Sequence, residues 1–242
     1  MPEATTQARR EIVDWALAER VACKIGGRSP VDPVVRADLE GVTRRAQALV
    51  TEFTGLYPTD DRVAARTLVL DRASWAQANV AAFRQLLTPI TDRFAAKMAA
   101  SSLGPLQSRA AGVETGFLLA YMSRRVLGQY DLLVPADSSP GAEGSSSDAV
   151  YYIAPNIIAL EQRFQLRPGE FRLWIALHEL THWIQFRAVP WMRPHFLSLV
   201  ERALSIVDPD PKRLSEALKR AVSEMRQKRN PFEGGGLLAA LA

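Results

Sequence analysis

The segment Phe171–Phe186, FRLWIALHELTHWIQF, constrains the fold of this chain more than any other stretch. Apolar residues recur in it at roughly helical spacing, and the preceding Pro168 suits the first turn of a helix. Glu179 is the one charged residue between Leu173 and Phe186. A helix that is apolar nearly all round is expected to be buried, so we predict that this segment forms a helix inside the core.

The same helix carries His178, Glu179 and His182 in the order His-Glu-Leu-Thr-His, the H-E-x-x-H pattern of zinc-dependent hydrolases. Residues four apart lie on one face of a helix, so both imidazoles should face one spot, where a zinc ion fits at about 2.0–2.1 Å from each ring nitrogen. Glu179 would project beside the metal, where it can take a proton from a zinc-bound water and pass it to a leaving group. We therefore expect zinc as cofactor, His178 and His182 as metal ligands, and Glu179 as the catalytic residue.

A plainer interpretation of the motif is a buried core helix whose histidines bond to backbone carbonyls. The chain holds three histidines, and two of them form the motif, so a chance match is rare. Two histidines and a glutamate in an apolar helix would also be costly without a compensating partner. The motif therefore favours a zinc site.

The third zinc ligand stays open on the sequence. A catalytic zinc usually has three protein ligands and one open position for water, and the motif supplies two of them. Glu201 follows His182 with eighteen residues between them, a spacing found in one class of zincins, but it adjoins Arg202 and would serve equally as a solvated residue. His195 is nearer, at the start of a predicted helix, where a capping or packing role is the alternative.

The stretches around the motif resemble a family of bacterial zincin-like metallopeptidases, whose members are labelled as hydrolases or as associated with biosynthesis of the deazaflavin coenzyme. The resemblance rests on Leu173–Phe186, Pro190–Phe196, Tyr130–Pro135, Val150–Ile157 and Asn230–Leu241. It implies a mostly helical fold and a zinc peptidase site at the motif residues, but no substrate. It also implies a further helix with an acidic residue after the glycine-rich Asn230–Gly236, which would place the third ligand beyond Ala242.

The periodicity of the whole chain predicts a mainly α fold, a helical zincin-like architecture with one small β ribbon. Its strands are expected at Tyr130–Val134 and Ala149–Ile153, with a mobile polar loop between them, and Thr67–Leu70 is a further extended run. We expect Val150–Ala154 to be an edge strand that receives the substrate backbone, or else a strand that only closes the core. The expected helices are 9–25, 33–53, 72–87 with a kink or a new helix at Pro89, 109–127, 156–164, 195–207 and 211–228.

The chain can be divided into an N-terminal helical region, residues 1–110, and a zincin-like region, residues 111–242, or it forms one continuous domain. A net charge of +4 with scattered arginine pairs argues against nucleic acid as a partner. No signal-type segment and no apolar run of about 18 residues is found, so a cytoplasmic protein without a membrane partner is expected. Cys23 stands alone and excludes an intrachain disulfide.

Three functions remain in competition. The first is a zinc metallopeptidase acting on a peptide or protein substrate. The second is a non-catalytic helical scaffold or partner-binding module that keeps a zincin-derived helix. Nucleic-acid binding, the third, rests only on the basic isoelectric point. If only His178 and His182 hold the zinc in this chain, we expect partial occupancy of the site, or an empty site.

Overall fold

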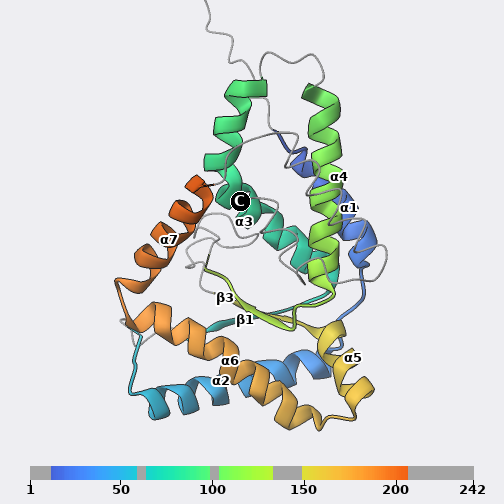
Figure 1. Ribbon diagram of the computed structural model, residues 1–242. Coiled ribbons are helices and arrows are strands. Elements are labelled where there is room, and N and C mark those ends of the chain that lie inside the picture. The colour runs from blue at the N-terminus through green and yellow to red at the C-terminus, as the bar shows by residue number, and fades with distance from the viewer. Residues whose placement is uncertain (1–11, 59–63, 99–103, 133–148, 207–242) are drawn as a thin grey trace, which may run out of the picture.

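The computed structural model describes residues 12–58, 64–98, 104–132 and 149–206 (Figure 1). Helices dominate this part of the chain, so the predicted mainly α class with one small β element is confirmed. In chain order the elements are α1 (Trp15–Gly26), α2 (Pro33–Thr54), β1 (Arg66–Leu70), α3 (Arg72–Met98), α4 (Gly104–Ser123), β2 (Gly128–Tyr130), β3 (Ala149–Ile153), α5 (Ala154–Phe164), α6 (Pro168–Ala188) and α7 (Met192–Ile206).

The three strands form one mixed sheet in the order β1-β3-β2. β3 pairs in parallel with β1, with Thr67 opposite Val150, and antiparallel with β2, with Tyr130 opposite the same Val150. The expectation that Val150–Ala154 is an edge strand is therefore wrong, because β3 is paired on both sides and all five of its residues are buried. Among the described strands, the edge beside α6 is β2. The prediction of a strand at Tyr130–Val134 is correct only at Tyr130, because β2 spans Gly128–Tyr130 and the next two residues are not in a strand. Residues 133–148 lie outside the described part.

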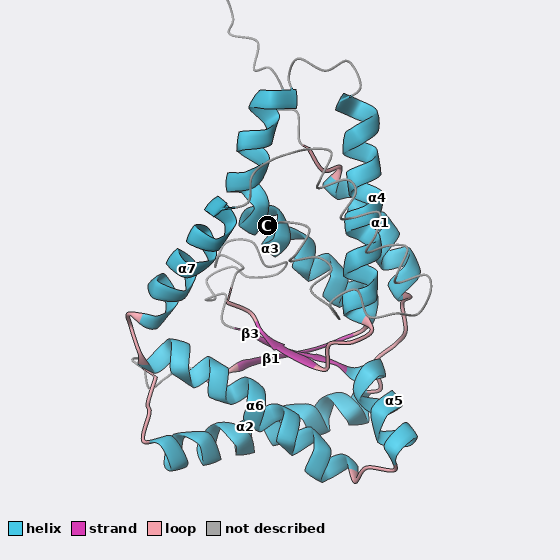
Figure 2. Ribbon diagram, viewed as in Figure 1, coloured by secondary structure: helices cyan, strands magenta, loops and turns pink. Residues whose placement is uncertain are grey.

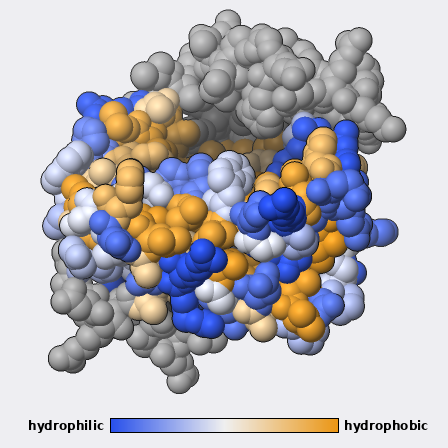
Figure 3. All heavy atoms as spheres, turned by 90° about the horizontal axis from the view of Figure 1, so that it is seen from below, coloured by the Kyte–Doolittle hydropathy of each residue, from blue (hydrophilic) through white to orange (hydrophobic). Residues whose placement is uncertain are grey.

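Helices cover both faces of the sheet (Figure 2), with α2, α5 and α6 on one face and α1, α3 and α4 on the other. Side chains of a strand alternate between its two faces, and β3 follows this rule. Val150 and Tyr152 join the core with α2 and α6, whereas Tyr151 and Ile153 join the core with α1 and α3. Viewed from the α2 and α6 side, the surface shows hydrophobic residues gathered among hydrophilic ones (Figure 3).

Short polar side chains set the starts of several helices. Asp32 accepts a hydrogen bond from the Val34 N–H at the start of α2, and Asp71 accepts one from the Ser74 N–H at the start of α3. The first helix begins at Trp15, later than predicted, because Asp14 caps it through the Leu17 N–H and the described residues before Asp14 are not helical. α3 continues as one helix through Pro89.

Gly112 and Gly116 of α4 lie at a close contact with α1. A Cβ atom added at Gly112 would lie 2.5 Å from the Asp14 carbonyl oxygen, and one added at Gly116 would lie 2.6 Å from the Ala18 carbonyl oxygen. These distances leave no room for a side chain, so α4 packs with its backbone directly against α1. Since α1 also packs on α3, these three helices form a compact layer above the sheet.

Arg172 links α6 to two neighbouring helices, α5 and α2. Arg172 donates two hydrogen bonds to the buried carboxylate of Glu161 on α5, at 2.7 and 2.8 Å, and one to Asp38 on α2 at 2.9 Å. Helices from both sides of residue 110 thus pack together, while the proposed division into two regions stays a prediction. None of the helices in the described ranges is long and apolar enough to span a membrane. The predicted helix 211–228 and the Asn230–Gly236 loop lie outside the described residues.

Candidate active site

The motif helix α6 is buried on one side only. Its buried residues are Ile175, Ala176, Glu179, Leu180, Trp183 and Ile184, which face the sheet and α2. The expectation of burial all round is wrong, since Trp174, His178 and His182 form an exposed stripe along the helix. These residues are exposed because the sheet and α2 cover only one side of the helix.

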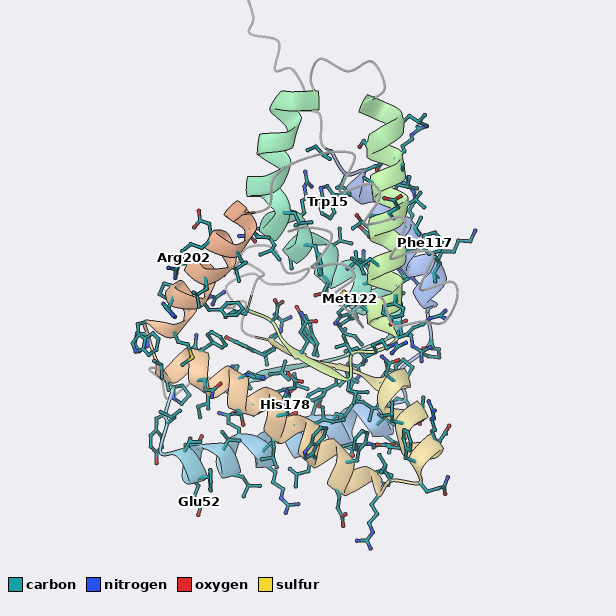
Figure 4. All side chains as sticks on the ribbon, in the orientation of Figure 1. Trp15, Glu52, Phe117, Met122, His178 and Arg202 are labelled. Atoms are coloured by element: carbon teal, nitrogen blue, oxygen red, sulfur yellow. The ribbon has the colours of Figure 1, made fainter. Side chains whose placement is uncertain are left out.

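His178 and His182 lie together on the exposed stripe, as their spacing predicts. Their ring centroids are 4.8 Å apart with an interplanar angle of 88°, and His178 lies in the middle of α6 (Figure 4). Burial lowers the pKa of His182, and the neighbouring His178 lowers it further, while a bond with Gln185 opposes the shift. A lowered pKa favours the neutral imidazole, which is the form that binds a metal ion.

Glu179 points away from the solvent, toward the edge strand β2. Its side chain is 7% exposed, and its Oε2 atom accepts a hydrogen bond of 3.0 Å from the Tyr130 N–H. A Cβ atom at Gly128 would lie 2.7 Å from Oε1, so only glycine lets β2 approach this closely. Burial raises the pKa of Glu179 to about 7, against the opposing effect of the Tyr130 N–H. A carboxyl group with a pKa near neutral can both accept and donate a proton at physiological pH.

Aromatic rings flank the histidine pair on both sides along α6. Toward the start of the helix, Trp174 stacks on His178 at 6.3 Å and on Phe171 at 6.2 Å. Toward its end, Phe186 stacks on Tyr130 of β2 at 5.8 Å and contacts Phe196 of α7 edge to face. The sequence did not identify these neighbours, because an aromatic residue in an apolar helix is equally typical of a packed core.

The two candidates for a third ligand are not gathered with the pair. His195 lies exposed at the start of α7, where it contacts Trp191 edge to face, and Glu201 is exposed farther along the same helix. Within the described ranges no group of three His, Cys, Asp or Glu side chains could hold a metal ion. His178 and His182 fit zinc in donor type and placement, as two of the usual three ligands.

The chain is similar to known proteins over most of its length. A family described as "Zincin-like metallopeptidase" matches residues 13–240 of the chain. The chain is also similar to a protein of known structure, described as "a putative hydrolase with a novel fold from Chloroflexus aurantiacus". The two are 27% identical, with a TM-score of 0.63 over 94% of this chain and 74% of the other. No curated protein matches the sequence.

Proposed function

Because the chain belongs to the zincin-like metallopeptidase family, we propose that it hydrolyses peptide bonds with zinc as cofactor and Glu179 as general base and acid. The observation that carries this proposal is the contrast between adjacent residues of α6. His178 and His182 are exposed side by side, and Glu179 between them is buried with a pKa of about 7. Acid–base hydrolysis needs a carboxyl group with a pKa near neutral and side chains of a type that binds a metal ion, and α6 carries both.

Each residue has a defined part in the reaction. His178 and His182 would hold the metal through ring nitrogens. Zinc, when bound, supplies a Lewis acid that polarises the scissile carbonyl and makes water a better nucleophile. Glu179 takes a proton from the attacking water and then gives it to the leaving amine. The Tyr130 N–H fixes the direction of the carboxylate, because it donates to Oε2 from the backbone of β2.

Metal analysis and a conservative substitution test the proposal together. The purified protein should bind zinc, hydrolyse an unstructured protein such as casein, lose activity with a chelator and regain it with zinc. Glu179→Gln should keep the zinc but lose activity by about 10²–10⁴-fold, the usual contribution of acid–base catalysis. The matched control is Glu170→Gln, which changes an exposed carboxylate in the first turn of the same helix. Full activity in Glu179→Gln, or a protein that never binds zinc, would overturn the proposal.

The second candidate is a scaffold that keeps the motif helix without turnover. It is favoured by the lack of a third ligand for the histidine pair within the described ranges. Two imidazoles alone give a weak site, because water takes the place of each missing ligand. Zinc titration by calorimetry separates the two functions. Tight binding by the 242-residue chain shows a complete ligand set and supports the peptidase, whereas no binding supports the scaffold.

A further inference from the structure

An exposed tryptophan stands directly beside the histidine pair. Trp174 is 60% exposed, although it belongs to a helix whose other apolar residues are mostly buried or half-buried. Exposing so large an apolar side chain forgoes the stabilisation that burial would give, so it contributes little to the core. It lies one helical turn before His178, and the two rings stack at 6.3 Å with an interplanar angle of 26°.

Trp174 contacts two other rings despite its exposure. Phe171, one turn earlier and half-buried, stacks against it nearly in parallel, with ring centroids 6.2 Å apart and an interplanar angle of 9°. Trp174 thus lies between the rings of Phe171 and His178. An aromatic side chain that is already oriented loses little conformational freedom when a ligand packs on it.

The distance from Trp174 to His178 matches the spacing of a bound peptide. An extended chain rises about 3.3 Å per residue, so about 6 Å corresponds to two residues. A side chain within two residues of a bond cleaved beside His178 would therefore reach the indole. Its aromatic face suits an apolar or aromatic group.

We propose that Trp174 is a specificity-determining residue, which packs against an apolar, preferably aromatic, side chain of the substrate within two residues of the scissile bond. This inference rests on the proposed peptidase function. It goes beyond that function because it names the class of side chain that the site selects and the residue that selects it.

Two small hydroxamates test the proposal without turnover. Acetohydroxamate and phenylacetohydroxamate share one zinc-binding group and differ by a phenyl ring, which is small enough to turn toward either end of the site. On the zinc-loaded chain, calorimetry should show that phenylacetohydroxamate binds about tenfold tighter, as expected for one aromatic contact. In Trp174→Ala this ratio should fall to about one, while the affinity for acetohydroxamate stays unchanged. Trp174→Phe should restore most of the ratio.

The matched control is Trp191→Ala. Trp191 is 62% exposed and contacts a histidine, His195, but that histidine is not grouped with the pair on α6. This variant should keep the tenfold ratio. A ratio that survives Trp174→Ala, or an equal loss of affinity for both hydroxamates, would overturn the role of Trp174 in specificity. If neither hydroxamate binds in a zinc-dependent way, the peptidase function itself fails, and this inference fails with it.

Discussion

Replacing Glu179 by glutamine should make the metal-free protein more stable at high pH and leave it unchanged at low pH. Glutamine has nearly the same shape, and its amide oxygen can still accept the Tyr130 N–H bond that Oε2 accepts now. The substitution therefore removes mainly the ionisable group. That group is buried, and burial of a carboxylate without a cationic partner costs free energy.

The size of the effect follows from the pKa of Glu179. Burial raises this pKa from 4.5 to about 7 in the folded protein, so the folded state holds its proton more tightly than the unfolded state does. Below about pH 4.5 the residue is protonated in both states and costs nothing. Between the two pKa values, each rise of one pH unit lowers the free energy of unfolding of the wild-type protein by about 1.4 kcal/mol. The full loss, reached above about pH 7, is therefore about 3 kcal/mol. The Glu179→Gln variant has no ionisable group at this position, so its stability does not fall in this way.

Thermal unfolding in the presence of a chelator measures the difference. At pH 8 the midpoint of Glu179→Gln should exceed that of the wild type by about 6–12 °C, given about 2–4 °C per kcal/mol for a chain of this size. At pH 4.5 the two midpoints should agree. Glu170→Gln, a change at an exposed carboxylate paired with Arg167, should shift the midpoint only slightly at either pH. Equal midpoints at pH 8, or a difference independent of pH, would refute a buried carboxyl group with a raised pKa.

Two glycines at close contacts, Gly116 and Gly128, give further predictions, and two glycines in open space serve as their controls. Gly116→Ala should destabilise the fold by about 1–3 kcal/mol in denaturant unfolding, because its Cβ would lie 2.6 Å from a carbonyl oxygen of α1, whereas Gly41→Ala on α2, with open space around it, should stabilise by about 0.5–1 kcal/mol. Gly128→Ala should lower peptidase activity by about 10²-fold while zinc affinity is kept, because its Cβ would lie 2.7 Å from Oε1 of Glu179 and displace the carboxylate. Gly169→Ala, with nothing within 4 Å, should leave activity unchanged, and equal effects at the two sites would contradict this reasoning.

Local interactions made much of the fold predictable. Asp32 and Asp71 cap helices through hydrogen bonds to residues two or three positions later, so their signals lie within a few residues of sequence. The sheet order was not predictable in this way. β3 is central because it pairs in parallel with β1, and these strands are separated by α3, α4 and β2 in the chain. No local pattern records which distant strand will be the neighbour.

The site divides in the same manner. The helical spacing of His178 and His182 predicts that their rings meet, and they do so at 4.8 Å. Their role as zinc ligands and that of Glu179 as base stay predictions. The sequence could not identify the partners of Glu179, the Tyr130 N–H and the bare backbone at Gly128, because they come from a strand about fifty residues earlier and act through the backbone.

Two residues of α6, five positions apart, reverse the ordinary rule of burial. Trp174, a large apolar side chain, is 60% exposed. Glu179, the one charged residue between Leu173 and Phe186, is 7% exposed. Folding alone would favour the opposite arrangement, since it would bury more apolar surface and leave the carboxylate in water. Local departures from the rules that stabilise a fold are expected at functional sites, where stability gives way to chemistry. Both departures lie close to His178 along α6. They are what our two proposals require, namely acid–base chemistry at Glu179 on the side of β2 and substrate contact at Trp174.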